Sequence, residues 1–80
     1  MSLIWFAREM DKKLEANSHK SGWSDCTLQY LSMRLTQERK ELANAIRQKN
    51  KKRIIEECTD VANFAMMIAE NTNTEIENEN

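Results

Sequence analysis

Apolar residues recur every three or four positions over three stretches of the chain, which is the spacing of one face of an α-helix. Ser2 is suited to cap the first helix, which we expect to end near Asn17. The second stretch runs from about 25 to 47, and the third runs from about 50 to Glu70. We therefore predict an all-α fold with three main helices.

The second and third helices have apolar stripes with the spacing of helices that pack in a nearly antiparallel pair. The stripes contain Leu28, Leu31, Leu35, Leu42 and Ala45, then Ile54, Val61, Phe64 and Ile68. The polar segment "RQKNKK" separates them, and Asn50 in it can cap the third helix. Before the second helix, "NSHKSGW" has turn residues, and Ser24 or Asp25 is a fit N-cap. These features predict a long antiparallel helical hairpin.

Residues 1–70 should form a single domain. The last ten residues, "NTNTEIENEN", contain one apolar residue, Ile76, so we expect 71–80 to be a disordered polar tail. The sequence has no proline and one glycine, and it is 40% hydrophobic and 31% charged, which favours uninterrupted helices. An 80-residue chain buries a smaller fraction of its surface than a typical domain of about 100 to 150 residues, so a partner chain or a metal should help to stabilise it.

The charges are balanced, with 12 Lys and Arg against 13 Asp and Glu. A net charge of -1 creates no field that would steer the protein to nucleic acid or to an anionic membrane. No apolar run reaches the roughly 18 to 20 residues that span a bilayer, and the first ten residues do not resemble a signal peptide. We therefore expect a cytoplasmic protein with no nucleic-acid or membrane partner.

Two glutamates, Glu38 and Glu57, occupy positions where the two apolar stripes should continue. Each has a second acid three residues later, Glu41 and Asp60, on the same helix face. In a hairpin that turns near residue 49, position 38 opposes 60 and position 41 opposes 57. Four carboxylates that converge in this way repel one another unless they bind protons or cations, and oxygen ligands suit Mg²⁺ or Mn²⁺. We infer a divalent-metal site, although such acids can also be ordinary surface residues, since each motif is common by chance.

The pattern Glu38-x-x-Glu41, fifteen intervening residues, then Glu57-x-x-Asp60 resembles the signature of the MazG-like all-α nucleoside triphosphate pyrophosphohydrolases. In that family the first motif commonly begins with a further glutamate, and this chain has Gln37 instead. Glu56 and Asn63 also match family positions often found near the metal and the nucleotide. The motif match covers residues 37 to 63, and the three-helix layout extends it over most of 1–70.

The resemblance implies a Mg²⁺-dependent enzyme that cleaves (deoxy)nucleoside triphosphates between the α and β phosphates. Its four acids, Glu38, Glu41, Glu57 and Asp60, would then be both metal ligands and catalytic residues. The resemblance further implies a multi-helix bundle in a homo-oligomer, a homodimer or a homotetramer. Exposed apolar residues near both ends of the predicted domain, including Trp5 and Met67, favour such an interface.

Five residues are candidates for substrate binding: Lys13, Lys20, Trp23, Arg34 and Asn63. The lysines can pair with phosphate, Trp23 can stack on a base, and Arg34 lies one turn before Glu38. Each also has a simpler interpretation, as a solvated lysine, as an aromatic cover on the core, or as one half of a surface ion pair. His19 and the basic segment "KNKKR" are weaker candidates.

Two other functions remain open at this point. The protein could be a non-catalytic helical module that docks a partner on its amphipathic faces, or a regulatory module that binds nucleotide without cleaving it. If the protein were only an interaction module, nothing would explain why glutamates interrupt both apolar stripes.

Overall fold

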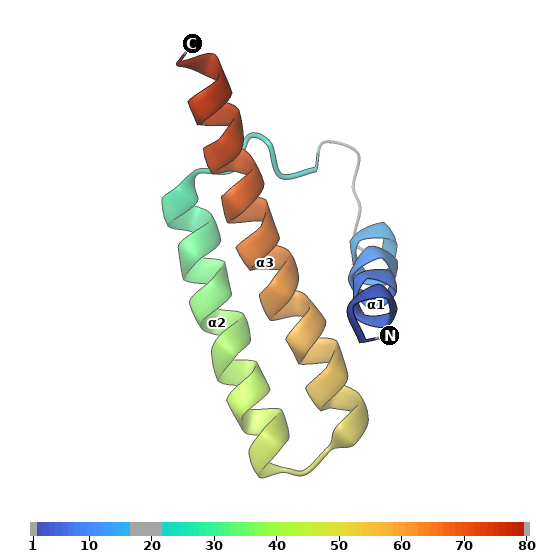
Figure 1. Cartoon of the computed structure of the whole chain (residues 1–80). Helices are drawn as coiled ribbons and strands as arrows, with labels where there is room; N and C mark the ends of the chain where they lie inside the picture. The colour runs from blue at the N-terminus through green and yellow to red at the C-terminus, as the bar shows by residue number, and fades with distance from the viewer. Residues whose placement is uncertain (1, 17–21, 80) are drawn as a thin grey trace.

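Three helices make up the part of the protein that the computed structural model describes, residues 2–16 and 22–79 (Figure 1). They are α1 (Ser2–Ala16), α2 (Leu28–Arg47) and α3 (Lys51–Asn78). No strand occurs among the described residues, so the predicted all-α class is confirmed. None of these helices combines the length and apolar character needed to cross a membrane.

The two long helices, α2 and α3, run side by side in opposite directions, as the apolar stripes predict (Figure 1). After α2, Lys49 adopts a left-handed conformation with φ 56°, which turns the chain back sharply. Asn50 then caps α3, because its side-chain oxygen accepts a hydrogen bond from the backbone N–H of Arg53 at 3.1 Å. The predicted hairpin turn and its cap are confirmed.

The start of α2 differs from the prediction. Neither Ser24 nor Asp25 caps it, since Thr27 does so, with Oγ1 3.0 Å from the backbone nitrogen of Tyr30. A separate turn precedes this cap, closed by the N–H of Cys26, which donates to the carbonyl of Trp23 at 3.0 Å. Among the possible capping residues, Thr27 caps α2, and it is the one that lies directly after this turn.

The end of α3 also differs, because the helix continues past Glu70 to Asn78. The segment lacks glycine and proline, so no residue stops the helix. Thr72 and Thr74 donate hydrogen bonds from their hydroxyls to the carbonyls of Ile68 and Glu70, at 2.7 and 3.1 Å. The expected disordered tail is thus an extension of the helix as far as the described residues reach.

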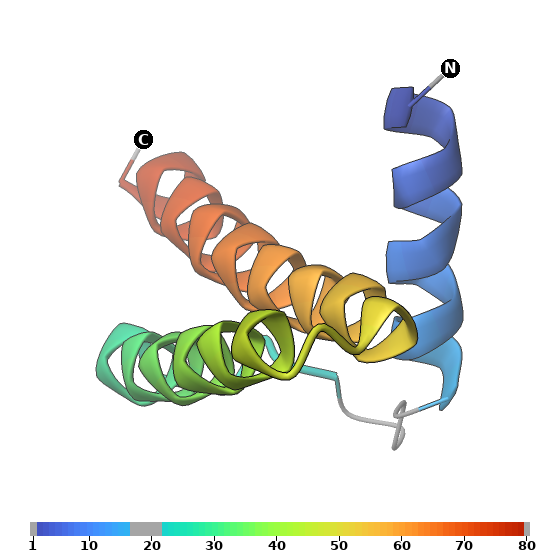
Figure 2. The ribbon, with the colours of Figure 1, turned by 90° about the horizontal axis from the view of Figure 1, so that it is seen from below.

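Within the described residues, α1 packs against α3 alone, on a different side from α2 (Figure 2). The side-chain amide of Asn63 donates to the carbonyl of Met10 at 3.1 Å, which ties α1 to the middle of α3. The N-terminal half of α1 points away from the hairpin (Figure 2). Leu3, Ile4 and Trp5 there are 75%, 56% and 49% exposed.

The interior of the described protein is small and unusually polar. Leu31 and Ala45 are its fully buried apolar side chains, and Glu38, Glu57, Thr59 and Asn63 are buried with them. Buried carboxylates destabilise a fold unless protons, partners or cations compensate their charge. The polar interior is therefore the feature of this fold that most needs a functional explanation.

Candidate functional site

Three carboxylates from both arms of the hairpin meet in the interior. Glu38 and Glu41 come from α2 and Glu57 from α3, and one oxygen of each lies within 4.8 Å of the others. Glu38 and Glu57 are only 6% and 9% exposed, whereas Glu41 lies at the exposed edge of the group. The two acidic pairs thus meet across the hairpin, as their positions relative to the turn predict. We call Glu38, Glu41 and Glu57 the three-acid cluster.

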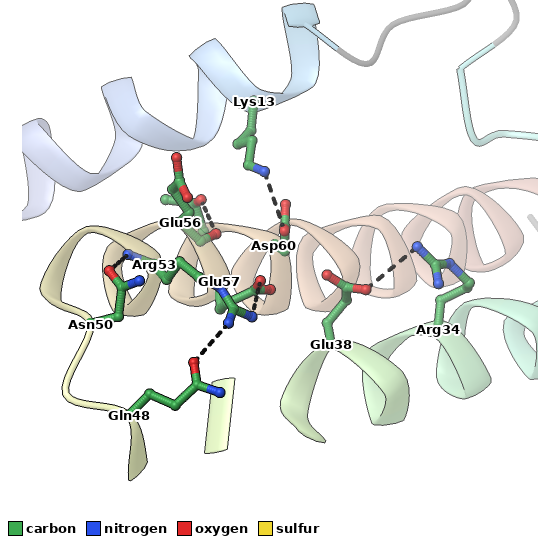
Figure 3. Close-up of polar contacts among 10 residues, drawn as sticks. Lys13, Arg34, Glu38, Gln48, Asn50, Arg53, Glu56, Glu57 and Asp60 are labelled. Atoms are coloured by element: carbon green, nitrogen blue, oxygen red, sulfur yellow. Dashed lines mark hydrogen bonds and ion pairs between the residues drawn. The ribbon is translucent and has the colours of Figure 1, made fainter. Parts of the chain in front are cut away.

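Asp60, the fourth predicted acid, lies beside the three-acid cluster. Its carboxyl group is near enough to that of Glu38 to raise the pKa of Glu38, which agrees with the pairing expected across the hairpin. On the other side, Oδ2 of Asp60 lies 3.3 Å from Nζ of Lys13, which reaches it from α1 (Figure 3). Asp60 therefore links the acidic hairpin to the first helix.

Glu38 has a strongly perturbed acidity. Its pKa is raised from the usual 4.5 to about 7, chiefly by burial and in addition by the hydrogen bonds and negative charges of Glu41 and Asp60. A carboxylate in this position needs a proton or a cation at neutral pH. Glu38, which interrupts the apolar stripe of α2, is thus the acid that needs a compensating proton or cation.

Each buried glutamate has an arginine four residues before it on its own helix. Nη2 of Arg34 lies 3.5 Å from Glu38, and Nη2 of Arg53 lies 3.4 Å from Glu57 (Figure 3). Sequence reasoning proposed Arg34 but passed over Arg53 as part of a solvated basic segment. The spacing of four residues, which places two side chains on one helix face, could have identified it.

One oxygen in the three-acid cluster is buried without a partner. Oε2 of Glu57 accepts a hydrogen bond from Arg53, but Oε1 accepts none from the described residues. An octahedral Mg²⁺ with ligands at about 2.0 to 2.1 Å holds neighbouring oxygens about 2.9 Å apart and opposite ones about 4.2 Å apart. A small inward movement of the three oxygens would reach that geometry, and all three are hard donors. The donor set therefore fits Mg²⁺ or Mn²⁺.

A cleft of about 600 Å³ opens beside the acids, which is within the usual range of ligand pockets. Glu38 and Asp60 line it together with four of the five predicted substrate-binding residues, Lys13, Trp23, Arg34 and Asn63. The fifth, Lys20, and also His19, lie outside the described residues. Residues from three separate segments, predicted independently, thus face one cavity.

The cleft has a charged part and an aromatic part. Lys13 and Arg34 lie at the acids, and the guanidinium carbon of Arg34 also lies 5.0 Å from the centre of the Phe64 ring. Trp23, Tyr30 and Phe64 form the aromatic part. Tyr30 was missed from the sequence, although it lies one turn before Arg34 on the same helix. Asn63 donates to α1, and its buried Oδ1 accepts no hydrogen bond from the described residues.

In comparisons with known proteins, no family model, curated protein or solved structure matches the chain. Its function must therefore be inferred from the acids, the cations and the aromatic residues around this cleft.

Proposed function

We propose that the protein is a Mg²⁺-dependent nucleotide pyrophosphohydrolase, which cleaves (deoxy)nucleoside triphosphates to a monophosphate and pyrophosphate. The observation that carries the proposal is that Glu38 of the three-acid cluster lines a cleft that is also lined by two cationic side chains and three aromatic rings. A nucleotide offers matching chemistry, because its phosphates need metal and cationic partners and its base can stack on aromatic rings. The resemblance of the acidic motifs to those of MazG-like enzymes supports the same reaction.

Glu38, Glu41 and Glu57 are the residues that would hold the metal. Bound Mg²⁺ supplies positive charge to the phosphate oxygens and lowers the pKa of a water that attacks phosphorus. Lys13 and Arg34 would bind the phosphates, exchanging part of their contact with Asp60 and Glu38 for contact with the substrate. Both cations already lie at the cleft, so binding needs only local side-chain movement.

In the proposed reaction, water attacks the α-phosphorus, the bond to the bridging oxygen breaks, and pyrophosphate leaves with the electron pair. The proton of the water would pass to a carboxylate outside the three residues that would hold the metal. Asp60 meets this condition best, since it lines the cleft beside Glu38 but lies outside the three-acid cluster.

A panel of ribo- and deoxyribonucleoside triphosphates with Mg²⁺ in ¹⁸O-labelled water tests the proposal. We expect monophosphate and pyrophosphate, with the label in the monophosphate because water attacks the α-phosphorus. Glu57→Gln should lower the rate at least 100-fold, whereas Glu75→Gln, a matched change on the exposed part of α3, should not. Metal-dependent binding without products would instead support a nucleotide-binding regulator, and neither binding nor turnover would reject the nucleotide site.

We also propose that the protein works as a homodimer or homotetramer. The chain exposes 6136 Å², whereas a compact monomer of its 9.4 kDa would expose about 5,000 Å². The difference is comparable to the roughly 800 Å² that each partner contributes to a standard interface. The apolar residues best placed to pack against a second copy of the chain lie on the projecting half of α1; they are Leu3, Ile4 and Trp5.

A further inference from the structure

The turn that carries Trp23 is attached to α3 beyond the point where the acidic site ends. The indole N–H of Trp23 donates a hydrogen bond to Oε1 of Glu70 at 3.0 Å. The side-chain amide of Asn71 donates to two backbone carbonyls of the same turn, that of Trp23 at 3.0 Å and that of Cys26 at 3.3 Å. Figure 1 shows the segment before α2 passing beside the C-terminal part of α3.

Asn71 holds both ends of this turn at once. The carbonyl of Trp23 also accepts the N–H of Cys26, so the turn and its attachment share one acceptor. The backbone of Trp23 cannot rotate without breaking both bonds, and Asn71 is half-buried, which limits replacement by water. Glu70 acts on the side chain of Trp23, because it fixes the edge of the indole ring.

Trp23 is one of the three aromatic residues of the cleft, and it is the one that lies on a turn. Tyr30 and Phe64 are held by helices, whereas the orientation of Trp23 depends on these contacts to α3. A side chain that is ordered before a ligand arrives binds it more tightly, because less conformational entropy is lost on binding.

We propose that Asn71 and Glu70 are positioning residues, which fix Trp23 as the aromatic wall of the cleft and so set its affinity for the base of the nucleotide. This inference rests on the proposed function. The two residues lie far from the three-acid cluster along α3, so they act on substrate binding and leave the bond-breaking step unchanged.

The test compares Asn71→Ala and Glu70→Ala with Asn73→Ala, a matched control at an exposed position of the same helix. For nucleoside triphosphate with Mg²⁺, Asn71→Ala should raise KM by about 3- to 10-fold and change kcat less than twofold. Glu70→Ala should raise KM less, and Glu70→Gln should restore it, because its amide oxygen can still accept the indole N–H. Asn73→Ala should match the unmodified chain in both constants.

A second measurement reports on the ring without substrate. The chain has two tryptophans, so in a Trp5→Phe background all tryptophan fluorescence comes from Trp23. Asn71→Ala and Glu70→Ala should lower its anisotropy and increase its quenching by acrylamide, and Glu70→Gln should not. The contact of Glu70 is exposed, so its loss does not endanger folding.

Unchanged KM and unchanged fluorescence in both alanine variants would overturn this inference alone. A loss of kcat at constant KM would overturn it as well, because it would place Asn71 in the chemical step. If the unmodified chain neither binds nor cleaves any nucleotide, the proposed function fails and this inference fails with it.

Discussion

Lys13 of α1 and Asp60 of α3 form an ion pair of 3.3 Å beside the buried acids (Figure 3). The two side chains are 33% and 20% exposed, so water screens the pair only in part. Because Asp60 also acts on the pKa of Glu38, the ion pair connects the first helix to the acidic site on the hairpin. It therefore bears on stability as well as on the proposed binding of phosphate.

Lys13→Ala should lower the free energy of unfolding by about 1 kcal/mol and Tm by about 4 to 8 °C in metal-free buffer. The loss leaves Asp60 beside Glu38 without its cation. Lys12→Ala is the matched control, since Lys12 is 73% exposed and pairs with Glu9 of its own helix. Thermal melts followed by circular dichroism would measure both, and equal shifts would contradict a special role for the Lys13 pair.

In the absence of metal, the raised pKa of Glu38 should make the protein less stable as the pH rises. The folded state binds the proton more tightly than the unfolded chain, so this contribution is complete below pH 4.5 and is lost as the pH approaches about 7. The loss amounts to roughly 3 kcal/mol if the whole shift applies. Glu38→Gln should flatten the denaturation profile over this range, and Glu75→Gln should not. If the stability of Glu38→Gln still fell with pH over this range, the raised pKa could not be assigned to Glu38.

Mg²⁺ bound at the proposed site should stabilise the folded protein, because the acids of that site come together only after folding. At about 100 times its dissociation constant, an ion that binds only the folded state adds about 2.7 kcal/mol. Glu57→Gln should lose most of this gain, because it replaces the carboxylate whose Oε1 accepts no hydrogen bond from the described residues. Tm measured against Mg²⁺ concentration checks this, with Glu77→Gln as the control on the exposed end of α3. Equal gains in both variants would place the ion elsewhere.

Arg34→Lys should reduce kcat/KM for a nucleoside triphosphate by about tenfold, although the charge remains. The guanidinium contacts Glu38 and Gln37 and lies over the ring of Phe64, and a single ammonium cannot make these contacts together. Arg47→Lys, at the far end of the same helix, is the control. Steady-state kinetics would decide, and an undiminished kcat/KM would show that only the charge of Arg34 is used.

The chain should sediment as a dimer or larger at micromolar concentration, and Leu3→Glu combined with Trp5→Glu should reduce it to monomers. Both changes place charges on the apolar half of α1, where a second copy would otherwise exclude water. Lys12→Glu alters the charge of the same helix without touching that surface and should leave the mass unchanged. Analytical ultracentrifugation would check this, and a monomer mass for the unmodified chain would reject the oligomer.

The local pattern of the sequence accounts for much of this fold. Periodic apolar residues predicted the helices, and Asn50 predicted the start of α3 because its side chain bonds a neighbouring N–H. The same reasoning failed at Thr27 and past Glu70. Several residues before α2 could cap a helix, and Asn71 anchors the extension of α3 through carbonyls that lie more than forty positions away.

For the candidate site, sequence spacing determined that acids from α2 and α3 would meet, because two helices joined by a short turn have little freedom in register. It did not determine which acid is buried, that Asp60 pairs with Lys13, or that Trp23 is held by α3. Those features depend on where α1 and the turn before α2 pack against the hairpin. Contacts between distant segments of this kind arise only when the whole chain has folded, and so the tertiary structure alone decides them.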